Sequence, residues 1–232
     1  MTAIVGTDSS ENNAQIKAIL ESFCQRIVFV GKSGSGHAVK SINNALLAAN
    51  LLSATEGLIA LAKFGVTPDL ALSAINYSSG SSKVTLGRFP DNILNRKFDY
   101  GFSLSLHCKD VDTATRFIAS QSSPSAPAVA PILSLTHSLM EVSRRELGDS
   151  VDHVEVVRSL EKWNGGVVLA TAAEAGDAQS SSQNNNHVSN AKILTGGPHS
   201  LLAKYGIKLV VCDMAGTTVD EGGLIYKLLE KV

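Results

Sequence analysis

The first apolar positions of the chain come in two short runs with a helical pattern between them. The runs at residues 2–6 and 27–30 have the length and apolar character of strands, and we expect the second strand to be buried. Between them, residues 13–23 show the spacing of a helix. The N-terminal part is therefore predicted to form a strand–helix–strand unit.

A long helix is predicted next, after a glycine-rich turn. Over residues 37–63 apolar side chains recur at helical spacing, as Val39, Ile42 and Leu46 illustrate. Gly65 suits the C-terminal cap of this helix, because glycine adopts the left-handed conformation without strain. Polar residues interrupt the richest apolar stretch, which favours a buried core helix over a membrane span.

Shorter helices are predicted beyond this point, each delimited by proline, glycine or capping residues. Pro68 fits the first position of a helix, and Asp152 with Glu155 resembles a capping box. The expected helices occupy residues 69–76, 109–120, 129–147 and 152–163, with a turn at residues 78–82. No strand is predicted between residues 64 and 163. The fold class is therefore mainly α, with an all-α core after the strand–helix–strand unit.

The C-terminal third has a different character. Residues 176–190 include a low-complexity polar run with nothing to bury, which is typical of a flexible linker. An apolar run at residues 207–212 then predicts one more strand. Four segments follow from this pattern, with boundaries at residues 1–31, 32–163, 164–206 (the linker, partly disordered) and 207–232.

Composition and charge restrict the classes of function. The 232-residue chain is 44% hydrophobic and 18% charged, with a net charge of −1, so nothing indicates binding to nucleic acid or to an anionic membrane. Three scattered cysteines argue for a reducing compartment, and neither they nor the six histidines have metal-ligand spacing. No basic segment with an apolar core opens the chain, so we expect a cytoplasmic protein without a metal.

Lys40, Asn43 and Asn44 are the first candidates for chemistry. Residues three and four apart share a helix face, so the three side chains should point towards one cleft. A lysine can transfer a proton once its pKa is lowered, and an asparagine amide can orient a carboxylate or hydroxyl. Solvated surface lysines and capping asparagines show the same spacing, so both interpretations stay open on the residues alone.

The segment Gly34-x-Gly36-x-x-x-Lys40-x-x-x-Asn44, which follows a strand, resembles the catalytic segment of the β-hydroxyacid dehydrogenases. That family includes the 3-hydroxyisobutyrate, tartronate semialdehyde, L-threonate and 6-phosphogluconate dehydrogenases. Further motifs follow in the order and spacing of the family, at residues 75–82, 88–90, 98–102 and 109–114. The resemblance covers roughly residues 1–163.

The resemblance implies roles for individual residues. Lys40 would be the catalytic general acid/base, Gly36, Asn43 and Asn44 would bind substrate, and Lys109 would reach the cofactor. It implies NAD or NADP as cofactor and hydride transfer on a small 3-hydroxy acid as the reaction. It also implies that residues 32–163 form a helical domain of the 6-phosphogluconate dehydrogenase C-terminal type, which packs against its twin in a homodimer.

The glycine-rich dinucleotide fingerprint of this family has no match in the chain. Val39 stands at the third glycine position when counting from Gly34, and Arg26 stands where a phosphate loop needs its first glycine. The resemblance therefore implies that residues 1–31 are the end of a Rossmann domain. We expect the fingerprint and the family's Ser-Gly-Gly substrate loop to lie before Met1.

A second resemblance lies near the C-terminus. The strand predicted at residues 207–212 leads into Asp213-Met-Ala-Gly-Thr-Thr-Val-Asp220, which resembles the first motif of the haloacid dehalogenase superfamily, and phosphonoacetaldehyde hydrolase in particular. Asp213 would be the nucleophile of such a hydrolase. Most members have a second aspartate where Ala215 stands, and we expect the remaining hydrolase motifs to lie beyond Val232.

Three interpretations stay open from the sequence. The chain is the substrate and cofactor-binding helical domain of an NAD(P)-dependent dehydrogenase, or a non-catalytic helical dimerisation fragment. The third interpretation is a piece of a bifunctional protein that joins a dehydrogenase to a phosphonatase-like hydrolase. We favour the first for the family assignment and the third as the explanation of the motifs expected beyond the two ends of the sequence.

Overall fold

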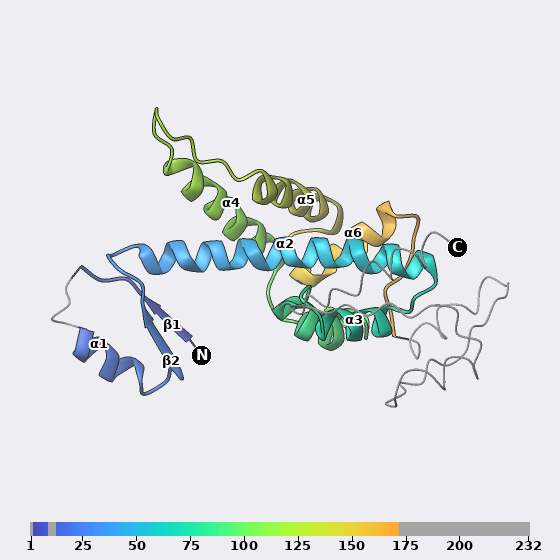
Figure 1. Ribbon diagram of the computed structural model, residues 1–232, viewed down its shortest axis with the longest axis horizontal. Coiled ribbons are helices and arrows are strands. Elements are labelled where there is room, and N and C mark those ends of the chain that lie inside the picture. Colours follow the sequence, from blue (N-terminus) through green and yellow to red (C-terminus); the bar gives the residue numbers. More distant parts are fainter. Residues whose placement is uncertain (1, 9–12, 172–232) are drawn as a thin grey trace, which may run out of the picture. The chain divides into compact units, whose positions relative to one another are not determined.

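Helix α2 (Ser35–Phe64) is the central element of the computed structural model, which describes residues 2–8 and 13–171 (Figure 1). It confirms the helix predicted at residues 37–63. Gly65 caps it with φ at 99° and donates its N–H to the carbonyl of Ala62, as expected for a left-handed C-terminal cap. Gly34, at φ 89°, precedes the helix at the other end.

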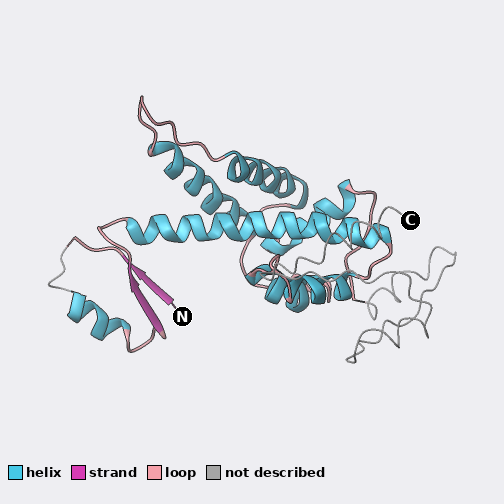
Figure 2. Cartoon of the chain, viewed as in Figure 1, coloured by secondary structure: helices cyan, strands magenta, loops and turns pink. Residues whose placement is uncertain are grey.

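Four shorter helices pack against α2. Figure 1 shows α4 (Leu104–Ser120) and α5 (Pro131–Leu147) on one side of α2 and α3 (Pro68–Asn76) on the other, and α6 (Val156–Trp163) also contacts it. The residues that α2 buries recur at helical spacing: Ala45, Ala48, Leu51, Leu52, Thr55, Leu58 and Ile59. Most of the described chain is helical, as predicted (Figure 2).

By length and composition α2 is also apolar enough to cross a membrane. Its most apolar window has a mean hydropathy of 1.6, and 39% of that window is buried inside the protein. The buried face contacts α3, α4, α5 and α6. Packing against four helices accounts for the apolar residues of this face, as expected for a core helix.

The predicted strand–helix–strand unit is present. Strands β1 (Thr2–Val5) and β2 (Arg26–Phe29) pair in parallel, with Thr2 opposite Arg26, and α1 (Asn13–Leu20) connects them. The prediction that the second strand is buried is wrong, because most of β2 is exposed. A parallel strand is buried only where helices cover both faces of its sheet, and in the described residues the sheet has two strands and no such cover.

A π-helix at Val84–Ile93, labelled η1, was not predicted. Its buried residues are Val84, Thr85, Phe89 and Ile93. Gly87 and Pro90 lie inside the segment, and both residue types disfavour a helix interior, so the sequence does not indicate a helix here. Pro90 has no N–H to donate. The last turn closes with the N–H of Leu94 donating to the carbonyl of Phe89 at 2.8 Å.

Two helix starts differ from the prediction. Helix α4 begins at Leu104, five residues before the expected start at Lys109, because the Ser103 hydroxyl accepts the N–H of Leu106 and caps it there. Asp152 does cap the last helical segment, since its carboxylate accepts the N–H of Val154 at 3.1 Å. That segment opens with a short 3₁₀ turn, η2 (His153–Glu155), before α6.

The chain stays attached to the helical core after α6. Leu169 is buried, its N–H donates to Glu161 Oε1 at 2.7 Å, and its carbonyl accepts from Arg96 Nη1 at 3.1 Å. The N–H of Thr171 donates to the carbonyl of Leu94. Core packing thus continues eight residues past the predicted boundary at Trp163. The predicted polar linker at 176–190 and the segment at 207–232 lie outside the described residues.

Candidate functional site

A cleft of about 910 Å³ opens between α2, η1, α4 and the loop before α4. It is lined by Lys40, Asn43, Asn44, Leu46, Leu47, Asn50, Ser81, Ser82, Lys83, Val84, Arg88, Tyr100, Gly101, Phe102 and Asp110. Both polar and apolar side chains face it. The cleft is therefore suited to a small ligand with polar groups.

Lys40, Asn43 and Asn44 line this cleft together, which confirms that they share one face of the helix. The Asn44 amide Nδ2 donates to Asp110 Oδ2 at 2.7 Å, and Asn43 Nδ2 donates to Asn44 Oδ1 at 3.3 Å. These two bonds fix the orientation of the Asn44 amide and leave one of its N–H groups for a ligand. Lys40 is exposed and forms no ion pair within the described residues.

Asp110 belongs to the motif at residues 109–114, but it was not predicted as a site residue. It connects α4 to α2 through Asn44, and its other oxygen lies 3.3 Å from Lys109 Nζ. The Lys109 side chain is 66% exposed and does not line the cleft itself. Lys109 is therefore free to contact a molecule bound at the edge of the cleft, beside Asp110.

Arg88 and Tyr100 were also missed, although both belong to the motifs that carry the resemblance. The guanidinium carbon of Arg88 lies 3.3 Å from the centroid of the Tyr100 ring, a cation–π contact. Arg88 Nε is buried and has no hydrogen-bond partner among the residues that the structure describes. Its place in the motif at residues 88–90 was the sequence signal that could have found Arg88.

Gly36 does not line this cleft. A Cβ at Gly36 would lie 2.6 Å from the carbonyl oxygen of Ile4, so glycine is required for the start of α2 to approach β1. Gly36 lines a smaller cavity of about 280 Å³ with His37 and Lys40. The predicted nucleophile Asp213 lies outside the described residues.

The charged side chains around the cleft are mostly cationic. Lys40, Lys83 and Arg88 face it with one carboxylate, Asp110, which is already bonded to Asn44 and Lys109. The remaining positive charge favours an anionic ligand.

Two buried histidines lie behind the cleft. His107 Nε2 donates to the backbone carbonyl of Asn44 at 2.9 Å, and its ring meets the ring of His153 edge to face at 4.8 Å. Burial lowers the pKa of His107, against the opposing effects of the Asn44 carbonyl and Asp110. Tyr100 packs edge to face on His153 at 5.3 Å, so the histidine pair supports the wall that carries Arg88.

Acidification is expected to destabilise the fold through His153. Burial, and then the charges of His107 and Arg88, lower the pKa of His153 to about 3. In the unfolded chain a histidine titrates near 6.5, so the unfolded state binds more protons between these two values. The free energy of unfolding should therefore fall as the pH drops below about 6.5, by up to about 1.4 kcal/mol per pH unit for this group. Urea unfolding at a series of pH values measures this decrease in the free energy of unfolding.

The matched variants for that measurement are His153→Leu and His37→Gln. Removing His153 should flatten the pH dependence above the range where carboxylates titrate, whereas removing the exposed His37 should not. An unchanged slope in His153→Leu would show that this ring is not the group responsible.

The comparisons with known proteins agree on one family. Residues 34–160 match the family model described as the NAD-binding domain of NADP-dependent 3-hydroxyisobutyrate dehydrogenase. The chain belongs to the β-hydroxyacid dehydrogenase family. NAD(P) is the cofactor of this family.

Individual relatives support the same assignment. The chain is 32% identical over 114 residues to 2-(hydroxymethyl)glutarate dehydrogenase of Eubacterium barkeri, an alignment that covers 49% of this chain and 38% of the relative. It is 26% identical over 161 residues to 2-hydroxy-3-oxopropionate reductase of Escherichia coli, covering 69% and 53%. The chain thus spans about half the length of these curated relatives, or less.

A solved structure shows the same fold. Mycobacterium tuberculosis 3-hydroxyisobutyrate dehydrogenase, solved with L-serine, superposes with a TM-score of 0.59 at 23% identity, covering 68% of this chain and 54% of that one. At this identity the likeness concerns the fold alone.

Lys109 is the residue for which the resemblance implies contact with the family cofactor. Its side chain is 66% exposed and lies beside Asp110, a carboxylate that lines the cleft. At the exit of β1, Gly6 packs closely against the turn before α2. A Cβ at Gly6 would lie 2.5 Å from the carbonyl oxygen of Lys32, so this glycine serves close backbone packing, and Asp8 accepts the N–H of Ser33.

No cluster of three or more metal-ligating side chains occurs in residues 2–8 and 13–171. In the same part of the chain, Cys24 and Cys108 are free and buried. Burial raises the pKa of the Cys108 thiol to about 12, so it stays protonated and is a poor nucleophile.

Proposed function

We propose that this chain carries the acid/base and substrate-binding part of an NAD(P)-dependent oxidoreductase that transfers hydride on a small 3-hydroxy acid. One observation carries the proposal: Lys40, Asn43, Asn44 and Asp110, contributed by two helices, line a single cleft. The relatives act on 2-(hydroxymethyl)glutarate and 2-hydroxy-3-oxopropionate by name. In both compounds the carbon that reacts is the one β to a carboxylate.

The cleft residues supply the proton chemistry and the orientation of the substrate. Lys40 gives or takes the proton on the substrate oxygen, and the free N–H of Asn44 donates to the same oxygen or its neighbour. Asp110 holds the Asn44 amide in place for this contact. The nicotinamide cofactor, when bound beside Lys109, would accept the hydride when the hydroxy acid is oxidised and would donate it when the carbonyl compound is reduced. Because Lys40 is exposed, substrate and cofactor must cover its amine to exclude water.

The experiment is a cofactor assay with the Asn44→Ala variant. The chain is incubated with NADH or NADPH and 2-hydroxy-3-oxopropionate, or with NAD or NADP and 3-hydroxyisobutyrate, and cofactor absorbance is followed. Asn44→Ala should lower kcat/KM about 10²-fold, the size of effect seen when a donor to the reacting oxygen is removed. The matched control is Asn95→Ala, whose amide bonds the carbonyl of Asp91 outside the cleft.

Equal activity of Asn44→Ala and Asn95→Ala would contradict the assignment of Asn44. Absence of any turnover by the unmodified chain with both cofactors would contradict the proposed function. The non-catalytic alternative, a helical dimerisation fragment, would then be favoured.

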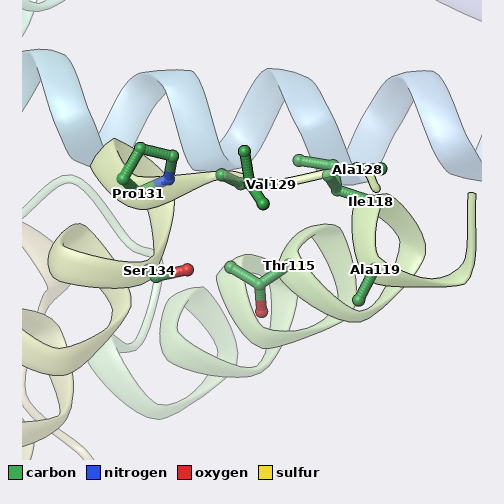
Figure 3. A pocket seen from close by; sticks show the side chains of 8 residues that line it. Thr115, Ile118, Ala119, Ala128, Val129, Pro131 and Ser134 are labelled. Carbon is green, nitrogen blue, oxygen red and sulfur yellow. The ribbon is translucent and has the colours of Figure 1, made fainter. Parts of the chain in front are cut away.

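We also propose that the helical domain forms a homodimer. A cavity of about 420 Å³ lies between the end of α4 and the start of α5, and Figure 3 shows Val129 and Pro131 beside it. Val129, in the loop before α5, lines this cavity and is 78% exposed. Ile132 and Leu135, near the start of α5, are 69% and 60% exposed. Large apolar side chains exposed together often mark an interaction surface. Light scattering should give twice 24.3 kDa, and Ile132→Glu should give the monomer mass. A monomeric unmodified chain would refute the homodimer.

Two further proposals rest on the sequence alone. Residues 207–232 are proposed to form a β-α unit of the haloacid dehalogenase type, with Asp213 as nucleophile, on the motif at Asp213–Asp220. Hydrolysis of phosphonoacetaldehyde that Asp213→Asn leaves intact would exclude this role. The chain is proposed to be cytoplasmic, and cell fractionation tests it.

A further inference from the structure

Arg88 is a charged residue of the cleft that the proposed acid/base chemistry does not use. It projects from η1, whereas Lys40 and the two asparagines project from α2. Its Nε is buried without a hydrogen-bond partner, and no ion pair to Arg88 occurs in the described residues. A buried donor without a partner is costly, so this arginine is suited to a partner that is not part of the described chain.

The contact with Tyr100 positions the guanidinium. At 3.3 Å from the ring centroid, the guanidinium carbon is at the contact distance of two flat groups lying face to face. In that arrangement the N–H donors lie in the guanidinium plane and stay available at its edge. Tyr100 is itself supported by the ring of His153, which burial keeps uncharged by lowering its pKa, so no second cation forms behind the pair.

Asp110, the carboxylate that lines the cleft, is not an ion-pair partner of Arg88 in the described residues. Asp110 is bonded to Asn44 at 2.7 Å and lies 3.3 Å from the amine of Lys109. The rest of the lining is neutral or cationic, including Lys83 beside the start of η1. An oriented, unpaired guanidinium in a cationic cleft fits a planar anion, and its fork of donors matches the two oxygens of a carboxylate.

We propose that Arg88 binds a carboxylate of the hydroxy-acid substrate, and that Tyr100 is the positioning residue that holds Arg88 for it. This inference rests on the proposed function and adds to it the basis of substrate selection. The reacting oxygen lies at Lys40 and Asn44 on one wall, and the acid group is recognised by Arg88 on the other. The site therefore selects hydroxy acids over the corresponding uncharged alcohols and esters.

A binding titration of the full chain tests this inference without requiring turnover. The probes are 3-hydroxyisobutyrate, its uncharged methyl ester and inorganic phosphate, and binding is followed by NMR shifts of backbone amides around the cleft. We expect the acid to bind in the millimolar range and the ester at least about tenfold more weakly. Arg88→Gln should weaken binding of the acid about ten- to hundredfold and leave the ester unchanged. The affinity of Arg88→Lys for the acid should lie between the affinities of the unmodified chain and of Arg88→Gln.

The matched control is Arg116→Gln, which removes an exposed arginine of α4 whose partner is Asp112. It should bind the acid like the unmodified chain. If Arg88→Gln does not fold, as judged by its thermal unfolding curve, Tyr100→Leu replaces it. That variant keeps the charge of Arg88 but removes its support, and it should weaken binding of the acid without affecting the ester.

Several results would overturn the inference: equal binding of acid and ester by the unmodified chain, no shift at the cleft with the acid, or full affinity of Arg88→Gln or Tyr100→Leu for the acid. Tighter binding of phosphate than of the acid would overturn the carboxylate assignment. Lys40→Ala should retain Arg88-dependent binding of the acid. If the unmodified chain binds the acid through Arg88 but shows no hydride transfer, the result contradicts the proposed function and leaves the role of Arg88 in carboxylate binding intact.

Discussion

Lys40→Ala is expected to lower kcat for hydride transfer about 10²–10⁴-fold, the usual contribution of a positioned general acid/base. Lys40 lines the cleft on the same helix face as Asn43 and Asn44, so a substrate oxygen held by these amides would be next to Lys40. Alanine cannot transfer the proton. The loss should appear in kcat more than in KM, because the proton is transferred only as the reaction proceeds. Steady-state kinetics with saturating cofactor measure both constants.

Two variants make the result specific. Lys63→Ala removes an exposed lysine at the other end of the same helix and should leave both constants unchanged. Lys40→Arg keeps the positive charge but cannot release its proton, so it should be nearly as inactive as the alanine variant. An active Lys40→Arg would mean that charge alone is needed at this position, and an active Lys40→Ala would remove the lysine from the mechanism.

Glu161→Ala should lower the free energy of unfolding by about 3 kcal/mol. The Glu161 carboxylate is 6% exposed and accepts two hydrogen bonds from Arg96, at 2.5 and 3.0 Å, and one from the N–H of Leu169 at 2.7 Å. Its removal leaves a buried N–H and most of a guanidinium without partners. The estimate is at the lower end for a buried ion pair because the Arg96 side chain is 25% exposed. Urea unfolding gives the difference.

Asp112→Ala is the matched control, since it breaks the exposed ion pair with Arg116 on the surface of α4. Such pairs contribute about 0–1 kcal/mol, so its midpoint should stay close to that of the unmodified chain. If the two variants unfolded at the same urea concentration, the Arg96–Glu161 pair would not be what attaches the segment after α6 to the core.

Local signals were enough to predict most of the helices. The long apolar periodicity and Gly65 located α2 to within two residues, and Pro68 located the start of α3. The predictions failed for two elements, the π-helix at Val84–Ile93 and the start of α4. The π-helix at Val84–Ile93 contains Gly87 and Pro90, which disfavour a helix when only the sequence is considered. Helix α4 starts at Leu104, five residues before the expected Lys109, because Ser103 caps it there.

Burial depends on what packs against an element and not on its own residues. The apolar run of β2 looks like a buried strand in the sequence, yet the strand is mostly exposed. Residues 164–171 fall in the segment predicted as a linker, yet Leu169 is buried and bonded to Glu161 and Arg96. In both cases the deciding contacts come from residues distant in sequence.

The sequence by itself determined that this chain is mainly helical, that it resembles the β-hydroxyacid dehydrogenases, and that Lys40, Asn43 and Asn44 share a helix face. These properties follow from spacing along one segment, which the 3.6-residue period of the helix converts directly into geometry. Only the tertiary structure decided that Asp110 holds Asn44 and that Arg88 stacks on Tyr100 in the same cleft. Those contacts join separate elements, and packing between elements, which no local pattern encodes, brings them together.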